Sequence, residues 1–308
     1  MDGSTLEWSG ATTFRLKTKG LLTIFLDAWL ERPASLDQYL SVDEVDECDY
    51  IFISHAHFDH LPSADRIAKE TGAIPESQLA AISGGERIPL FIKEQRHKVI
   101  VASSSRPHGL PSGPPSGPPG PPTPNPDDAI ITVHAWPSLH ALMPLGDHRS
   151  FPEVMDTGTV YTGSGSHSCT LDVTRGLTYG LGGLLKMDLV PPQMHQDMKD
   201  FVTYMKDRDM NRYSFFDGGQ IMYNFLIDGK ALLWNGHLGG YEGILKEEPD
   251  FAVKEVQWIG EPSKVTWCLH DRCPINPKHI NVAIATERVE EGTKSKVIEL
   301  TPAQPFRL

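Results

Sequence analysis

The sequence predicts an α+β fold in which two sheets are covered by helices. Candidate strands fall in both halves of the 308-residue chain, whereas helical periodicity is confined to a few segments. The regular alternation of strand and helix that a doubly wound parallel sheet requires is not apparent. We therefore expect two packed sheets with helices on their outer faces.

Short apolar runs and turn residues define the N-terminal elements. Residues 6–15 and 21–27 are predicted strands joined by a turn at 18–20, and residues 49–54 (DYIFIS) have the length of a buried strand. Residues 62–72 show helical periodicity, with Pro62 suited to the first turn and Gly72 to the end. A strand, a histidine-rich turn and a helix are thus predicted in close succession.

The second half of the chain repeats this mixture. Residues 129–136 (AIITVHAW) predict a strand, and residues 197–211 predict a charged helix with one apolar stripe. Residues 220–227 and 230–234 predict a hairpin that turns at residues 228–229, an Asp-Gly pair. Two late strands are expected at 265–269 and 296–300, the second being the last of the chain.

Residues 107–126 have a different composition. Ten of these 20 residues are proline and four are glycine. Proline has no backbone N–H to donate, so this segment cannot join a sheet. We expect a solvated surface loop between strands, with a lid or an SH3-type ligand as the alternatives.

Composition excludes several classes of function. The chain has 28 Lys+Arg and 40 Asp+Glu, a net charge of −12, which disfavours binding to nucleic acid or to an anionic membrane. No window is apolar enough to predict a transmembrane helix, and the N-terminus does not read as a secretory signal. The four cysteines form no disulfide framework, which favours reduced thiols and a cytoplasmic location.

The strongest chemical signal is the segment 54–60, SHAHFDH. His55, His57, Asp59 and His60 follow a predicted buried strand and precede a predicted helix. Imidazole nitrogen and carboxylate oxygen are the donors that bind zinc at about 2.0–2.2 Å. In extended backbone His55 and His57 project to the same side, so both can reach one metal. Asp59 and His60 can turn toward a second metal beside the first.

This string resembles the HxHxDH signature of the metallo-β-lactamase superfamily. The resemblance implies a four-layer αβ/βα sandwich, with two mixed sheets, helices outside and metals at the sheet edges. It covers a single domain, residues 1–308, and is nearest to the L-ascorbate-6-phosphate lactonase-like branch. Asp27, at the end of the second predicted strand, aligns with a structural aspartate near the site.

The resemblance also implies a ligand set. The first metal is expected at His55, His57 and His140, and the second at Asp59, His60 and His270. Asp59 is also the expected catalytic residue, which orients a metal-bound hydroxide and passes a proton to the leaving group. The expected cofactor is Zn²⁺, as one or two ions, with Mn²⁺ or Fe²⁺ as alternatives.

Two features depart from the superfamily pattern. His237 aligns with the aspartate that usually bridges both metals, and an imidazole cannot bridge two cations through one ring nitrogen. The stretch 249–265 is shorter than the superfamily pattern implies, since a β/α unit is expected between the bridging position and the last histidine. The first departure predicts either a rearranged site or a weakly bound second metal. The second predicts an altered sheet edge and an altered position of His270.

The remaining histidines and cysteines are given ordinary interpretations. His134 is expected to be a hydrogen-bonded core residue, and His167 to lie in a Gly/Ser loop, with substrate contact as the alternative. Cys268 and Cys273 are interpreted as a core thiol and a loop thiol rather than as a zinc site.

The function expected from these residues is hydrolysis of a small-molecule lactone, ester, amide or phosphoester. The alternative is a degenerate, non-catalytic member of the same fold that binds a ligand or partner, and His237 and the short 249–265 stretch motivate it. A third possibility is an interaction protein that acts through residues 107–126. The sequence predicts neither the substrate nor the oligomeric state.

Overall fold

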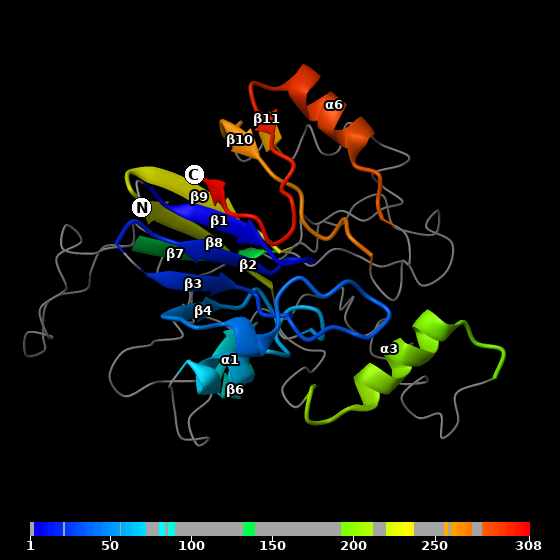
Figure 1. The fold of residues 1–308 in the computed structure, drawn as a ribbon. Helices are drawn as coiled ribbons and strands as arrows, with labels where there is room; N and C mark the ends of the chain where they lie inside the picture. The colour runs from blue at the N-terminus through cyan, green and yellow to red at the C-terminus, as the bar shows by residue number, and fades with distance from the viewer. Residues whose placement is uncertain are drawn as a thin grey trace, which may run out of the picture.

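The structure is a computed structural model, and Figure 1 shows how its elements are arranged. It describes residues 3–20, 22–55, 57–71, 80–83, 86–89, 132–138, 192–211, 220–236, 256–257, 260–272 and 279–308. The predictions for residues 107–126, His167 and Cys273 lie outside these ranges, as do residues 249–255 and 258–259 of the short stretch. For His134 only the backbone is described.

The first sheet has five strands in the order β12-β1-β2-β3-β4. Only the β3–β4 pair is parallel, so this sheet is mixed. The strands are β1 (Thr5–Trp8), β2 (Phe14–Lys17), β3 (Thr23–Leu26), β4 (Tyr50–Phe52) and β12 (Phe306–Arg307). The turn predicted at 18–20 and the strand predicted within 49–54 are confirmed.

The prediction of one strand over residues 6–15 is wrong, because a tight turn separates β1 from β2. Gly10 and Ala11 both have positive φ angles, 89° and 46°. Ser9 N–H donates to the carbonyl of Thr13 at 2.9 Å, and Thr13 N–H donates to the carbonyl of Gly10 at 2.9 Å. The left-handed backbone that closes this turn suits glycine and is uncommon for other residues.

The second sheet is antiparallel, with the order β7-β8-β9. Its strands are β7 (Thr132–Ser138), β8 (Gln220–Ile227) and β9 (Lys230–Trp234). Asp228 and Gly229 join β8 to β9 with φ angles of 51° and 75°, the backbone of a two-residue hairpin turn. The predicted hairpin is confirmed at its predicted bounds.

A shared core joins the two sheets face to face. The first sheet contributes Leu16, Ile24 and Phe52, and the second contributes Tyr223 and Phe225. The ring of Phe52 meets those of Tyr223 and Phe225 edge-on, with centroids 5.3 and 5.0 Å apart. Burying each such side chain contributes about 2 kcal/mol, so this interface stabilises the packing of the two sheets.

The outer face of the first sheet is covered by helix α1 (Ala64–Glu70), as predicted for residues 62–72. Phe25 and Ile51 point to this side and pack with Ile67 of the helix. Strand β3 therefore buries both faces, which explains its uninterrupted apolar sequence. Two sheets packed together with a helix outside confirm the predicted α+β sandwich.

Helix α3 (Gln196–Lys206) ends earlier than the predicted 197–211. The backbone at Asp207 is extended, and Asn211 Nδ2 donates to the carbonyl of Tyr204 at 2.7 Å, which folds the following turn back on the helix. The buried face of α3 packs with Trp29 and Phe58.

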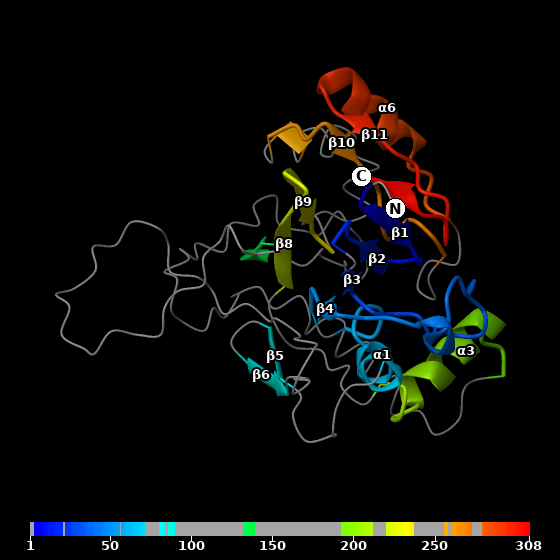
Figure 2. The same ribbon diagram turned by 60° about the vertical axis from the view of Figure 1, so that its left-hand side comes forward.

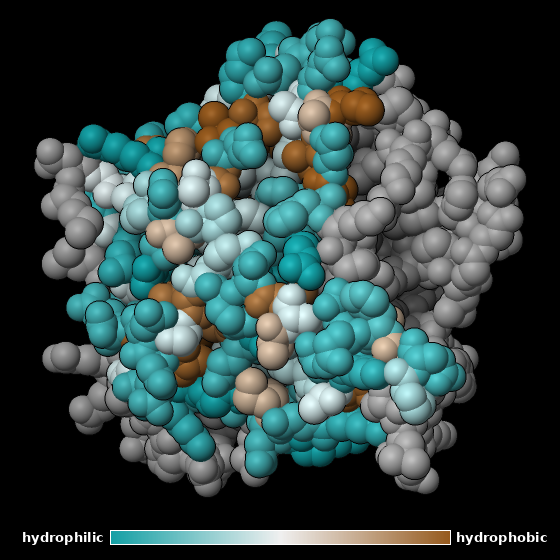
Figure 3. Space-filling view, turned by 45° about the vertical axis from the view of Figure 1, so that its right-hand side comes forward, coloured by the Kyte–Doolittle hydropathy of each residue, from teal (hydrophilic) through white to brown (hydrophobic). Residues whose placement is uncertain are grey.

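The C-terminal elements form a smaller unit. Strands β10 (Lys264–Val265) and β11 (Lys296–Val297) pair in parallel, and helix α6 (Ala283–Gly292) packs on them through Val289. In both ribbon views α6 lies at the end of the molecule opposite α1 (Figures 1 and 2). Figure 3 shows hydrophobic residues gathered beneath α6 on an otherwise mostly hydrophilic described surface.

Two predictions for this region are wrong. The strand expected over 265–269 ends at Val265, and Leu269 has a left-handed φ of 57° that no continuing strand could adopt. The strand at 296–297 is not the last, because β12 follows and pairs with β1. The remaining described elements are the 3₁₀ turn η1 (Val42–Glu44) and the hairpin of β5 (Ala80–Ser83) with β6 (Glu86–Pro89).

Candidate metal centre

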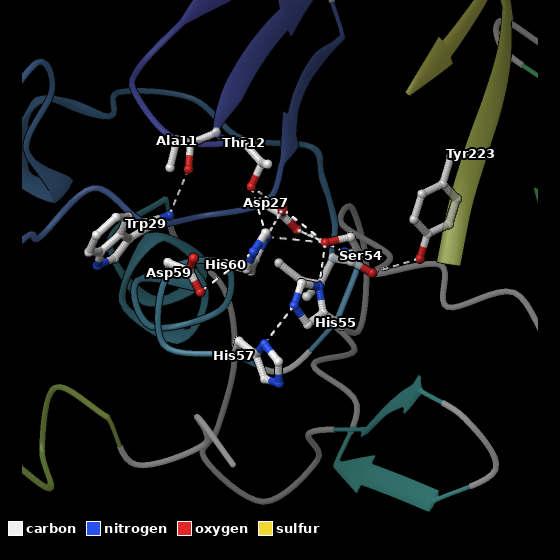
Figure 4. Close-up of polar contacts among 12 residues, drawn as sticks. Ala11, Thr12, Asp27, Trp29, Ser54, His55, His57, Asp59, His60 and Tyr223 are labelled. Carbon is white, nitrogen blue, oxygen red and sulfur yellow. Dashed lines mark hydrogen bonds and ion pairs between the residues drawn. The ribbon is translucent and has the colours of Figure 1, made fainter. Parts of the chain in front are cut away.

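Three histidine rings of the 54–60 segment meet at the end of β4. His55, His57 and His60 are all 5% exposed or less. The ring centroid of His55 lies 4.3 Å from that of His57 and 3.9 Å from that of His60. Figure 4 shows the three rings converging beside the end of β3. Buried imidazoles need polar partners, so such a cluster is costly unless its nitrogens are occupied.

His55 and His57 face each other through ring nitrogens. Nε2 of His55 lies 2.9 Å from Nδ1 of His57. Two nitrogens bound tetrahedrally to one zinc ion at about 2.0–2.1 Å are separated by about 3.3 Å. The two atoms are therefore already near the separation that a shared cation requires, and the chemistry of the pair fits a metal.

Asp27 is the hub of the polar contacts behind these rings. Its side chain is fully buried, and its φ of 52° is left-handed. Oδ1 accepts the N–H of Ser54 at 2.8 Å, and Oδ2 accepts the hydroxyl of Thr12 at 2.5 Å. Such backbone strain costs about 1 kcal/mol or more and persists only where surrounding contacts hold it. The contacts at Asp27 do so (Figure 4).

His60 is oriented by this carboxylate. Its Nδ1 lies 2.5 Å from Oδ2 of Asp27, while its Nε2 lies 3.5 Å from Oδ1 of Asp59. Burial lowers the pKa of His60, but the negative charges of Asp59 and Asp27 outweigh it, so the pKa is raised overall. A histidine that donates one N–H to a carboxylate and keeps the other nitrogen for a metal is a frequent arrangement in metal sites.

Asp59 differs from the three histidines in its access to solvent. Its side chain is 21% exposed, whereas that of His60 beside it is fully buried. Asp59 is thus the acidic group of the cluster that an incoming molecule can reach.

The C-terminal His270 is brought toward this centre through the β1–β2 turn. Leu269 N–H donates to the carbonyl of Ala11 at 3.0 Å, and Ala11 N–H donates to Oδ1 of Asp271 at 3.1 Å. The next residue, Thr12, contacts both Asp27 and His60. These hydrogen bonds hold the segment that contains His270 next to the histidine cluster.

The His270 ring has an unused nitrogen. It stacks on Trp8 with centroids 4.5 Å apart and planes at 13°. Its Nδ1 is buried and has no hydrogen-bond partner among the described residues. Burial lowers the pKa of His270, which favours the neutral form that binds metals.

Of the other expected ligands, His140 and His237 lie outside the described residues. Gly236, the residue before His237, is described. A Cβ atom at this position would lie 2.8 Å from Oγ of Ser54, so only glycine fits without displacement. The chain therefore passes directly beside the cluster one residue before the expected bridging position.

In the part of the chain that the structure describes, no three His, Cys, Asp or Glu side chains are arranged to hold one metal ion. His55 and His57 face each other, whereas His60 faces Asp27 and Asp59. The described contacts therefore present two candidate ligand pairs, the nitrogens of His55 and His57 and the nitrogen–oxygen pair of His60 and Asp59.

Sequence reasoning assigned no role to Thr12, Ser54, Arg32 or Asp271. Thr12 and Ser54 hydrogen-bond to the histidines or to Asp27, and Arg32 and Asp271 pair beside them. None of the four belongs to a recognisable sequence motif. The Gly10–Ala11 turn beside Thr12 was the one available signal, and it was interpreted as part of a strand. Cys268, interpreted as a core thiol, is partly buried and packs against the core between the two sheets. Burial raises the pKa of its thiol to about 12.

Comparison with known proteins finds a matching family model. Residues 29–171 match the sequence model of the Metallo-beta-lactamase superfamily. Over these residues, which are somewhat less than half of the chain, the sequence is similar to the metallo-β-lactamase superfamily. No helix in the described residues is both long and apolar enough to cross a membrane.

Individual relatives are similar to the chain over short stretches. A UPF0173 metal-dependent hydrolase of Thermodesulfovibrio yellowstonii is 35% identical over 68 residues, which are 22% of this chain and 26% of that protein. A UPF0173 metal-dependent hydrolase of Staphylothermus marinus is 42% identical over 72 residues, 22% of this chain and 31% of that protein. The matches thus span about a quarter of the curated relatives' length.

A solved structure also resembles the chain. It is Igni18, described as a novel metallo hydrolase from Ignicoccus hospitalis. The two share 14% identity and a TM-score of 0.49, with 99% of this chain and 98% of that chain covered.

Proposed function

We propose that this protein is a metal-dependent hydrolase. In this proposal His55, His57 and His140 hold the first cation, and Asp59, His60 and His270 hold the second. His237 occupies the position between them. The observation that carries the proposal is the buried histidine cluster, in which the nitrogens of His55 and His57 face each other and Asp27 orients His60.

The proposed cofactor is zinc, with Mn²⁺ or Fe²⁺ as alternatives, because imidazole is the main donor. A divalent cation, when bound, lowers the pKa of water and polarises a carbonyl or phosphoryl oxygen. Asp59 is proposed as the catalytic residue, because its partly exposed carboxylate can accept a proton and return it to a leaving group. The proposed substrate is a small lactone, ester, amide or phosphoester.

The net charge of −12 supports a small-molecule substrate over nucleic acid. Ring opening of a lactone or a cyclic amide takes first place among the proposed reactions because of the resemblance to the lactonase-like branch. The relatives named as metal-dependent hydrolases support the reaction class.

The test combines metal analysis with hydrolysis assays. Purified protein is analysed for its metals and assayed with a panel of lactones, esters and phosphoesters, beside the variant His57→Ala. We expect the variant to remain folded while losing most metal and all hydrolysis. His195→Ala is the matched control, since the His195 side chain is 78% exposed and lies outside the cluster. Full metal content in His57→Ala would contradict the ligand assignment.

The second candidate is a non-catalytic protein of the same fold that binds a ligand or partner. The imidazole of His237 at a position that usually carries a bridging carboxylate favours it. A folded protein that binds no metal and hydrolyses nothing in the panel would replace the first proposal with this one.

A further inference from the structure

The buried carboxylate of Asp27 has enough donors around it to fill its acceptor sites. Oδ1 accepts the N–H of Ser54, and Oδ2 accepts the hydroxyl of Thr12 and the Nδ1–H of His60. The hydroxyl of Ser54 lies 3.1 Å from Oδ1 and 3.0 Å from Oδ2. An ionised carboxylate offers about four lone-pair sites. These four donors therefore satisfy it completely.

The same serine hydroxyl lies between Asp27 and His55. Its Oγ is 3.0 Å from Nδ1 of His55. A hydroxyl has one hydrogen, and a buried carboxylate is a stronger acceptor than a neutral imidazole. Ser54 therefore donates to Asp27 and can only accept from His55. This donor count assigns the hydrogen of His55 to Nδ1.

The assignment leaves a lone pair on the opposite nitrogen of the ring. With its hydrogen on Nδ1, His55 presents a bare Nε2, the atom that faces Nδ1 of His57 at 2.9 Å. The same carboxylate leaves Nε2 of His60 facing Asp59. One buried charge thus orients one ring of each proposed metal site, directly for His60 and through a serine for His55 (Figure 4).

We propose that Ser54 is a positioning residue that relays the charge of Asp27 to His55 and fixes that ring as the Nδ1–H tautomer, with Nε2 ready for a metal. The metal-binding part of this inference rests on the proposed function, whereas the tautomer does not. Ser54 is not among the proposed metal ligands. Its Oγ lies 3.0 Å from Nδ1 of His55 and also 3.2 Å from Nδ1 of His60, so the tautomer of His55 is the readout specific to the proposed role.

The test reads the tautomer directly in metal-free protein labelled with ¹⁵N-histidine. Long-range ¹H–¹⁵N spectra distinguish a nitrogen that carries hydrogen from a bare one, and the signals missing from His55→Gln identify His55. We expect wild-type His55 to show hydrogen on Nδ1 and a bare Nε2. Hydrogen on Nε2 in the wild type overturns the proposal without any variant.

Variants then separate positioning from a purely structural role. Ser54→Ala should shift His55 toward the Nε2–H tautomer and weaken zinc binding about 10–100-fold in chelator competition, the usual effect of losing a residue that orients a ligand. Ser54→Thr keeps the hydroxyl and should restore the tautomer. Ser63→Ala is the matched control, because Ser63 is equally buried but its Oγ accepts only from Leu30 and Glu31.

The outcomes are distinguishable from failure of the proposed function. If Ser54→Ala keeps the wild-type tautomer, or loses no more zinc affinity than Ser63→Ala, the positioning role is refuted. If wild-type protein binds no zinc, the proposed function fails. The tautomer of His55 in the metal-free protein still tests whether Ser54 positions that ring.

Discussion

Nη2 of Arg32 lies 2.7 Å from Oδ2 of Asp271, 239 positions later in the chain. Both side chains are almost completely buried, with exposures of 1% and 3%. The guanidinium of Arg32 also lies over the ring of Trp29, 4.7 Å from its centroid. This ion pair joins the segment after β3 to the segment that carries His270.

Removing one partner of this pair should be strongly destabilising. Arg32→Met leaves the carboxylate of Asp271 buried without its counter-charge, so we expect a loss of about 3–5 kcal/mol in the free energy of unfolding. Denaturant titration measures it. Arg15→Met is the control, because the Arg15–Glu7 pair is more exposed, at 19% and 8%, and should cost clearly less. Equal losses in the two variants would contradict the importance of the Arg32 pair.

Gly236→Ala should damage the metal centre as well as stability. The new Cβ would lie 2.8 Å from Oγ of Ser54 and 3.1 Å from its Cβ, so the serine must move. We expect a loss of about 1–3 kcal/mol and weaker zinc retention. Gly229→Ala is the comparison, since its positive φ costs about 1–2 kcal/mol but nothing lies within 4 Å of its Cβ. It should leave zinc content unchanged, and a similar loss of zinc in both variants would refute the prediction.

His237→Asp should raise occupancy of the second metal site if residue 237 lies between the cations. A carboxylate neutralises part of the charge of a two-metal cluster, whereas an imidazole does not. We expect wild-type protein to carry nearer one metal than two, and the variant to carry more, as measured by elemental analysis. Two tightly held metals in the wild type and one in the variant would identify His237 as a competent ligand.

Cys268 should resist alkylation in the folded protein. Burial raises the pKa of its thiol to about 12, which leaves about one thiol in ten thousand ionised at pH 8. A free thiol with a pKa of about 8.5 is roughly one quarter ionised at that pH. Peptide mass spectrometry after iodoacetamide treatment should find Cys268 unmodified until denaturant is added. Rapid modification under native conditions would show that the site opens.

Local patterns in the sequence were sufficient for several elements. The hairpin at Asp228-Gly229 has its predicted bounds, because a two-residue turn is specified by the two residues that form it. The helix after the histidine motif follows from periodicity within one segment. The predicted single strand over 6–15 failed because Gly10 and Ala11 adopt left-handed backbone and form a turn within it.

The sequence by itself determined the donors of the candidate metal centre, because His55, His57, Asp59 and His60 lie within six residues and their spacing carries the signal. Only the tertiary structure decided what surrounds them. Thr12 and Asp27 contact His60, and Trp8 stacks on His270, across separations that no local pattern encodes. These supporting residues are common polar and aromatic types, so their sequence does not mark them. They contact the site only because the two sheets pack together and the β1–β2 turn lies beside the histidines.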